Sequence, residues 1–287
     1  LSANLNGTMK VVSTQRSQVL AGRLATALNI PVIDTRWQKF PDGEIYVRAE
    51  QPAEKVVICG SILTSDDLVE ILLLKDIYSE SDITLVIPYM GYARQDKQFN
   101  PGEPLSARAI ARILGADVSR VYTVNIHEKS VLNHFHTEAA DVTLSSPAAE
   151  YIKTLSLDEP LILSPDEGAL HLAEDVAGYG KWESDYLQKT RLSGDKVRIE
   201  PKSVQVSGRD VVILDDIIST GGTQATAASM LYEQGARSIH TVGIHGVLAS
   251  GAYTRLTSAG IASISCSDTI ERACSTYSAA PVLAEYL

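Results

Sequence analysis

The segment from Val211 to Ala236, VVILDDIISTGGTQATAASMLYEQGA, most constrains what this chain can fold into. An apolar run ends in two acids, and a turn of small residues at Ser219 to Thr223 then opens a helical pattern. We expect the apolar run, Val211 to Leu214, to be a buried parallel strand, so that the turn lies at the carboxyl edge of a sheet. A helix N-terminus at that place stabilises a phosphate through unpaired backbone N–H groups and the helix dipole.

The two acids beside the turn indicate what the phosphate is attached to. Carboxylates would repel a phosphate, but they accept hydrogen bonds from sugar hydroxyls and hold water around Mg²⁺. Glycines allow the backbone to approach a ligand closely because they carry no side chain. We therefore predict a site for a phosphorylated ribose at Asp215, Asp216, Ser219, Thr220, Gly221, Gly222 and Thr223. The alternative is that the acids and glycines merely form a polar turn after a buried strand.

Short β-rich apolar runs alternate with helical patterns along the rest of the chain, which is typical of parallel strands with crossover helices. The expected strands are Lys10 to Ser13, Val56 to Cys59, Ile83 to Ile87, Val121 to Val124, Leu161 to Leu163 and Ile239 to Gly243. The expected helices are Ser17 to Leu28, Asp66 to Tyr78 with Ser65 as N-cap, Ala169 to Val176 and Thr223 to Gln234. Two α/β domains follow, 9–145 and 146–287, with Met9 as the expected native start.

Composition excludes several classes of protein. The formal net charge of −10 lacks the basic footprint of a general nucleic-acid binder. The three cysteines, Cys59, Cys266 and Cys274, lack metal-ligand spacing and indicate a reducing compartment. No run of about 18 apolar residues occurs, so we expect a cytoplasmic protein with no membrane partner.

One segment departs from the α/β alternation. Tyr186 to Glu200, YLQKTRLSGDKVRIE, predicts two strands around a polar turn at Ser193 and Gly194. This hairpin would carry Lys189 and Arg191 near its tip. An exposed, solvated hairpin is the alternative interpretation.

The segment around Asp215 resembles the loop that binds phosphoribosyl diphosphate (PRPP) in the phosphoribosyltransferase fold. Further segments make the chain similar to the ribose-phosphate diphosphokinase (PRPP synthetase) family, and the Ser219 position resembles its archaeal type. These are FPDGE at Phe40 to Glu44, GYARQDKQFNPGEPLSAR at Gly91 to Arg108, NIHEKS at Asn125 to Ser130, SPDEG at Ser164 to Gly168, and the hairpin. The resemblance implies two phosphoribosyltransferase-like domains, each a central mostly parallel sheet flanked by helices.

The resemblance also implies a role for each segment. It places ATP at Phe40, Asp42, Gly43, Glu44, Arg94, Gln95, Asp96, Lys97 and His127. It assigns Mg²⁺ to His127 and Asp166, where a diphosphate could bind the N–H groups that follow Asp166. Lys189 and Arg191 would be catalytic, with Arg191 also contacting ribose 5-phosphate. A homo-oligomer is implied, because in the family the FPDGE element reaches ATP across a subunit interface.

The implied reaction converts MgATP and ribose 5-phosphate into AMP and PRPP. Two alternatives stay open at this point. A phosphoribosyltransferase would use the same loop with PRPP as its substrate, and a non-catalytic regulatory homologue would keep the fold without using the hairpin cations.

Overall fold

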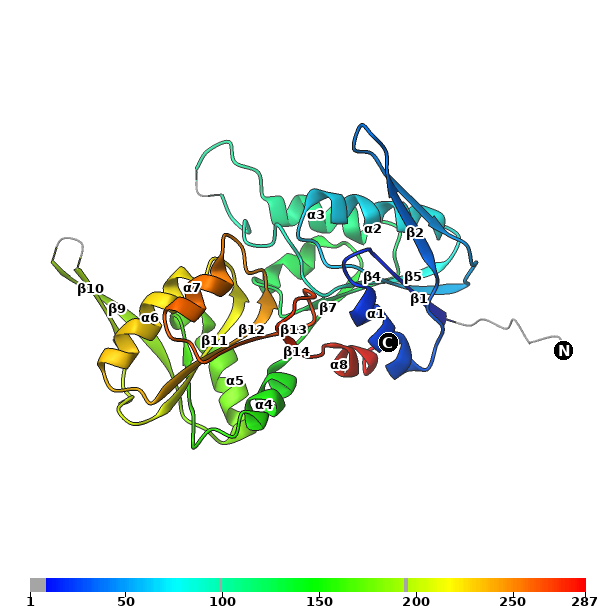
Figure 1. Cartoon of the computed structure of the whole chain (residues 1–287). Helices are drawn as coiled ribbons and strands as arrows, with labels where there is room; N and C mark the ends of the chain where they lie inside the picture. The colour runs from blue at the N-terminus through cyan, green and yellow to red at the C-terminus, as the bar shows by residue number, and fades with distance from the viewer. Residues whose placement is uncertain (1–8, 99, 194–195) are drawn as a thin grey trace. The chain divides into compact units, whose positions relative to one another are not determined.

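The computed structural model describes residues 9–98, 100–193 and 196–287, and these form two compact units (Figure 1). The first unit contains residues 9–143 together with 269–271 and 279–287. The second contains 144–268 and 272–278. These units differ from the ranges 9–145 and 146–287 at the C-terminus, because the last residues of the chain pack on the first unit. The Tyr122 hydroxyl, for example, donates to the Tyr286 carbonyl oxygen at 2.9 Å.

The first unit is built on a five-stranded parallel sheet in the order β1-β4-β5-β6-β7. Its strands are β1 (Met9–Ser13), β4 (Lys55–Cys59), β5 (Asp82–Ile87), β6 (Arg120–Val124) and β7 (Glu138–Val142). Its helices are α1 (Gln18–Leu28), α2 (Ser65–Ile77), α3 (Ser106–Gly115), the 3-10 helix η1 (Lys129–His134) and α8 (Ala280–Ala284). Side chains of α2, α3 and η1 share one apolar core with the sheet, and α8 contacts α1.

Helix α2 begins one residue earlier than its apolar spacing predicts. Thr64, not Ser65, is the N-cap, because it forms a reciprocal capping box with Asp67. The Thr64 N–H donates to Asp67 Oδ2 at 2.7 Å and the Thr64 hydroxyl donates to the same oxygen at 2.9 Å. Satisfying these otherwise unpaired groups fixes where the helix starts.

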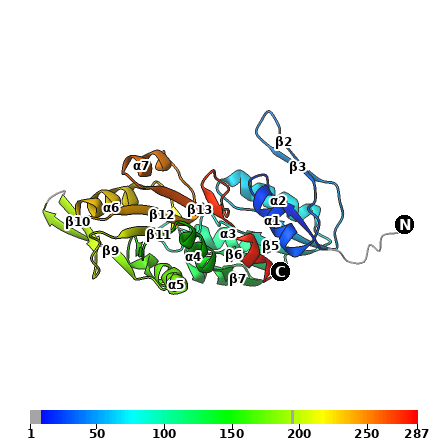
Figure 2. The same cartoon turned by 60° about the horizontal axis from the view of Figure 1, so that its bottom comes forward.

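An antiparallel hairpin, β2 (Thr35–Lys39) and β3 (Ile45–Ala49), stands out from the sheet of the first unit in both views (Figures 1 and 2). Neither strand is among those expected from apolar runs in the sequence. The first strand, TRWQK, is mostly exposed and carries no apolar run, so pattern alone does not reveal it. The FPDGE segment forms the tip between the two strands.

The second unit has a seven-stranded sheet in the order β10-β9-β8-β11-β12-β13-β14, parallel except for β10. Its strands are β8 (Leu161–Ser164), β9 (Ser184–Ser193), β10 (Lys196–Pro201), β11 (Asp210–Ile218), β12 (Ser238–Gly246), β13 (Ser263–Ser267) and β14 (Ser275–Tyr277). Helices α6 (Gly222–Glu233) and α7 (Ala252–Ser258) cover one face (Figures 1 and 2). The other face holds α4 (Ser145–Thr154) and α5 (Leu170–Gly180), the latter preceded by the 3-10 helix η2 (Glu167–Ala169).

The predicted fold class, mostly parallel sheets flanked by helices, is therefore confirmed. Within the described residues no helix is both long enough and apolar enough to cross a membrane.

Candidate active site

The turn between β11 and α6 has a backbone that requires glycine at one position. Gly221 is the N-cap of α6 with φ +69°, and a Cβ there would lie 3.0 Å from Leu256 Cγ. At Gly222 the nearest atom to an added Cβ is Thr220 Oγ1, 3.9 Å away. Gly221 thus serves the fold, whereas the open space at Gly222 is available to a ligand approaching the first N–H groups of the helix.

The carbonyl oxygens of this turn are held by the loop that follows β12. The Leu248 N–H donates to the Ile218 oxygen at 2.9 Å, and the Ala249 N–H donates to the Ser219 oxygen at 3.0 Å. The Arg255 guanidinium donates to the Thr220 carbonyl oxygen. Because the carbonyls are engaged by the protein, the turn is fixed with its oxygens turned toward the 248–255 segment.

The two acids lie inside β11, not after it as predicted. Strand β11 extends to Ile218, and Asp215 pairs with Gly243 of β12 in the register of the sheet. Burial, followed by the charge of Asp216 and a hydrogen bond with it, raises the pKa of Asp215 well above its ordinary value. Gln224 opposes this shift by donating from Nε2 to Asp215 Oδ2 at 3.1 Å, and Asp166 adds a further negative charge nearby.

Asp166 follows β8 as predicted, and two of the N–H groups after it are engaged by its own side chain. Asp166 is the N-cap of η2, and its Oδ1 accepts from the Gly168 N–H at 2.9 Å and the Ala169 N–H at 3.2 Å. Both bonds use Oδ1, so Oδ2 can face a cation while the cap stays intact. A carboxylate oxygen suits Mg²⁺.

His127 is exposed in the loop after β6, which ends at Val124. The charges of His127 and Lys97 both reach Glu128, whose pKa is lowered mainly by hydrogen bonds from Ser130. The loop after β6 and the segment carrying Lys97 therefore come together in the first unit. Among the described residues, His, Cys, Asp and Glu side chains form no group of three or more that could hold a metal ion.

The segment from Gly91 to Arg108 carries four predicted ATP residues: Arg94, Gln95, Asp96 and Lys97. Arg94 is exposed, and the Gln95 carbonyl side-chain oxygen accepts from the Ser106 hydroxyl at the start of α3. Gly91 begins the segment in close contact with another backbone, since an added Cβ would lie 2.3 Å from the Ile62 oxygen. This contact fixes where the segment leaves the sheet.

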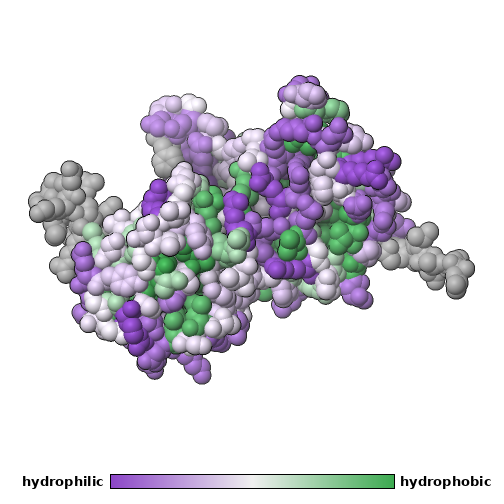
Figure 3. Space-filling view, in the orientation of Figure 1, coloured by the Kyte–Doolittle hydropathy of each residue, from purple (hydrophilic) through white to green (hydrophobic). Residues whose placement is uncertain are grey.

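The hairpin tip is closed by its own hydrogen bonds. The Phe40 N–H donates to the Glu44 oxygen at 2.8 Å, and the Gly43 N–H donates to the Phe40 oxygen at 2.9 Å. Asp42 Oδ1 accepts from the Glu44 N–H at 3.3 Å. Phe40 remains 43% exposed beside Tyr46, their rings meeting edge to face at 6.2 Å. The surface around this hairpin is mainly hydrophilic (Figure 3), so the exposed aromatic pair is an unusual feature there.

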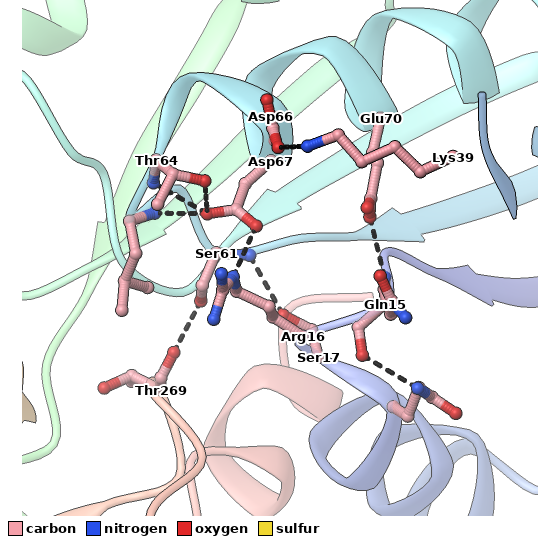
Figure 4. A network of polar contacts seen from close by, with 12 residues as sticks. Gln15, Arg16, Ser17, Lys39, Ser61, Thr64, Asp66, Asp67, Glu70 and Thr269 are labelled. Carbon is pink, nitrogen blue, oxygen red and sulfur yellow. Dashed lines mark hydrogen bonds and ion pairs between the residues drawn. The ribbon is translucent and has the colours of Figure 1, made fainter. Parts of the chain in front are cut away.

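The tip end of β2 is tied to α2, and α2 is in turn tied to the loop after β1 (Figure 4). Lys39 Nζ lies 2.7 Å from Asp66 Oδ2, and Arg16 Nε donates to Asp67 Oδ1 at 2.7 Å. Gln15 donates from its backbone N–H to Glu70 Oε2 at 2.8 Å. These contacts surround a cavity of about 520 Å³. Of these contacts, the Lys39–Asp66 ion pair joins the hairpin to α2.

Lys189 and Arg191 lie on β9, opposite Ile199 and Val197 of β10. The hairpin predicted from sequence is thus present. The positions of their side chains, and the turn residues 194–195, lie outside what the structure describes.

Sequence patterns did not single out Gln224, Thr241, Arg255 or Lys202. Arg255 holds the turn after β11, and Lys202 Nζ lies 5.0 Å from the centre of the Tyr186 ring. Gln224 and Thr241 are buried beneath Asp215. No sequence pattern marks these positions, because the burial of Gln224 is known only from the structure.

A parallel sheet that carries a glycine turn at a helix N-terminus is a phosphate-binding arrangement, and here paired acids lie beside it. Residues 143–278 match the family model described as the phosphoribosyl transferase domain. Residues 9–117 match the N-terminal domain of ribose phosphate pyrophosphokinase. The chain belongs to the ribose-phosphate pyrophosphokinase family.

Similar proteins cover the chain almost completely. A ribose-phosphate pyrophosphokinase of Methanosarcina acetivorans is 47% identical over 97% of this chain and 99% of its own length. One from Halobacterium salinarum is 42% identical over 96% of this chain and 100% of its own. The crystal structure of phosphoribosylpyrophosphate synthetase from Mycobacterium smegmatis is 26% identical, with a TM-score of 0.83 over 97% of both chains. The family predicted from sequence, including its likeness to archaeal members, is confirmed.

Proposed function

We propose that this chain transfers the diphosphoryl group of MgATP to the C1 hydroxyl of ribose 5-phosphate, giving PRPP and AMP. The observation that carries this proposal is the fixed turn at Ser219 to Gly222 beside the partly desolvated pair Asp215 and Asp216, in a member of this family. The N–H groups at the start of α6 bind the 5-phosphate, and the two carboxylates accept from the ribose hydroxyls.

The remaining assignments divide between nucleotide binding and catalysis. ATP lies against Phe40, Asp42, Gly43 and Glu44 of the hairpin tip and against Arg94, Gln95, Asp96, Lys97 and His127. Asp166 and His127 hold Mg²⁺, which when bound neutralises the triphosphate. Asp166 supports this role because both of its cap bonds among the described residues use Oδ1, whereas the imidazole of His127 is a less common ligand for a hard cation.

The chemical step needs positively charged groups near the oxygen atoms on which negative charge develops. The C1 hydroxyl oxygen attacks the β-phosphorus, the bond from that phosphorus to the α–β bridging oxygen breaks, and AMP departs with the electron pair. Lys189 and Arg191 donate to the oxygens on which charge develops, and Arg191 also binds the sugar phosphate. Their position on a hairpin suits groups that enter the site when substrates are bound.

We further propose a homo-oligomer in which the hairpin tip contributes to the ATP site of a neighbouring copy. The exposure of Phe40 and Tyr46, at 43% and 41%, supports this arrangement because aromatic side chains on a hydrophilic surface are suited to a partner or ligand.

The deciding experiment measures AMP formation from ATP with and without ribose 5-phosphate. We expect AMP only when both substrates and Mg²⁺ are present, with PRPP formed in equal amount. Lys189→Ala should lower kcat by roughly 10²- to 10³-fold with ATP affinity little changed, because a donor aimed at developing charge acts in the transition state. AMP release that is independent of ribose 5-phosphate would contradict the proposed reaction, and near-normal turnover by folded Lys189→Ala would remove that residue from it.

A further inference from the structure

Gln224 is a buried polar side chain whose hydrogen bonds lead directly to the ribose site. It is the third residue of α6 and only 3% exposed. Its Nε2 donates to Asp215 Oδ2 at 3.1 Å, and its Oε1 accepts from the Thr241 hydroxyl of β12 at 2.8 Å. Burying an amide is costly unless it is hydrogen-bonded. Here both the NH₂ group and the carbonyl oxygen of the side chain have a partner.

Thr241 determines which end of the amide faces Asp215. Thr241 is fully buried, and its hydroxyl has one hydrogen to donate. The 2.8 Å distance to Gln224 Oε1 is shorter than the 3.2 Å distance to the Ile213 carbonyl oxygen. With Oε1 accepting from Thr241, the NH₂ group is directed at the carboxylate, and an ionised carboxylate is the acceptor that this group needs.

Asp215 needs such a donor because its buried surroundings disfavour the charged form of its carboxyl group. Burial and the neighbouring Asp216 raise its pKa, and the hydrogen bond from Gln224 acts in the opposite direction. Together with the hydrogen bond between Asp215 and Asp216, the bond from Gln224 to Oδ2 limits rotation of the carboxylate about its last side-chain bond. Holding Oδ2 therefore fixes the plane of the group.

We propose that Gln224, oriented by Thr241, is a positioning residue that holds the Asp215 carboxylate in the orientation that accepts from a ribose hydroxyl. The inference rests on the proposed function, in which Asp215 binds the sugar of ribose 5-phosphate. Gln224 is buried and contacts Asp215, so in this proposal it acts through that carboxylate. Its contribution is to pre-organise the carboxylate before the sugar arrives, which lowers the entropic cost of binding.

The test replaces the amide with a side chain of similar length that forms no such hydrogen bonds. Gln224→Met should raise both the KM and the calorimetric Kd for ribose 5-phosphate by about 10-fold, while the KM for ATP changes less than twofold. Thr241→Val, on a different element, should act in the same direction, and Thr241→Ser should restore most of the affinity because it keeps the hydroxyl. Ser229→Ala is the matched control, since this α6 hydroxyl bonds only the Ala225 carbonyl oxygen among the described contacts.

A double-mutant cycle separates positioning from simple stabilisation of the core. In an Asp215→Asn background, Gln224→Met should add little further loss of ribose 5-phosphate affinity, because the carboxylate through which it acts is gone. If Gln224→Met lowers the melting temperature but leaves the ribose 5-phosphate affinity unchanged, the positioning role of Gln224 is overturned and the proposed reaction is not. If the wild-type protein binds ribose 5-phosphate but forms no AMP, only the proposed reaction is overturned. The binding titrations would then still decide the role of Gln224.

Discussion

Asp210 begins β11 and Asp215 lies within it, and we predict that replacing each of them changes the free energy of unfolding in opposite directions. The pKa of Asp215 is raised by burial and by Asp216, so between about pH 3.9 and its folded value the native state binds more protons than the unfolded chain. The free energy of unfolding therefore falls as pH rises through that window. Asp215→Asn should raise the free energy of unfolding by roughly 0.5–2 kcal/mol at pH 8, while weakening ribose 5-phosphate binding.

Asp210→Asn is the matched control on the same strand. Arg237 donates to both carboxylate oxygens, at 2.9 and 2.6 Å, and the Ser238 hydroxyl adds a third bond, so the pKa of Asp210 is held far below its ordinary value. Its contribution to stability is present above about pH 3.9 and is lost as pH falls toward the folded value. The substitution should cost about 1–3 kcal/mol at neutral pH in urea unfolding. If Asp215→Asn and Asp210→Asn changed the free energy of unfolding in the same direction, the opposite pKa shifts assigned to the two residues would be contradicted.

Asp166 allows magnesium binding to be tested apart from folding. Asp166→Asn retains an oxygen that can accept from the Gly168 and Ala169 N–H groups, so η2 keeps its cap. A neutral amide is a poorer ligand for Mg²⁺ than a carboxylate. We expect the Mg²⁺ concentration for half-maximal rate to rise about 10-fold, with the melting temperature nearly unchanged. An unaltered magnesium titration in the folded variant would leave Asp166 with only its capping role.

At the scale of elements, sequence patterns located the strands with buried apolar runs and missed those without them. Strands β4, β5, β8 and β12 were predicted within a few residues because both of their faces are covered. Strand β11 was predicted to end before its acids. Its true end is set by pairing, since Ile217 and Ile218 continue the ladder with His245 and Gly246, and no local pattern encodes the length of a partner strand.

The candidate site could be predicted from the sequence to the extent that it depends on local motifs. Gly221, Asp215 and Asp216 stand together in the chain, so their proximity needed no tertiary knowledge. The support from Thr241 and Arg255 could not be predicted, because these residues approach through the packing of β12 and α7 against β11 and α6. The spacing of polar residues in the sequence does not show which of them are buried against the site and which are exposed.

The β2–β3 hairpin gives a prediction that belongs to a whole element. It forms a separate two-stranded sheet among the described strands, and Phe40 at its tip is too exposed to contribute much to folding. Phe40→Ala should raise the KM for ATP by roughly 10-fold through lost base stacking, with the ribose 5-phosphate KM unchanged. Tyr179→Ala, an aromatic 54% exposed on α5, is the control and should alter neither KM. Steady-state kinetics with each substrate varied would show whether the effect is confined to ATP.

At the scale of the whole molecule, the chain order does not match the order of the compact units. The segments 269–271 and 279–287 pack with the first unit, although they follow the entire second unit in the sequence. Glu271 Oε1 accepts from the Val19 and Leu20 N–H groups at 2.7 and 3.0 Å. It therefore supplies the acceptor and the negative charge that the first turn of α1 lacks. The first unit is thus completed by residues about 250 positions away.

This long-range completion predicts that the C-terminal helix stabilises the first unit specifically. Leu283 of α8 is fully buried, and α8 contacts α1. Leu283→Ala should cost about 2–4 kcal/mol through lost burial and the cavity left behind, and Glu285→Ala, exposed just after the same helix, should cost less than about 0.5 kcal/mol. Hydrogen exchange measured by mass spectrometry should increase first in peptides of α1 and β6, with β11 and β12 protected as in the wild type. Faster exchange in β11 before α1 would show that the tail stabilises the second unit instead.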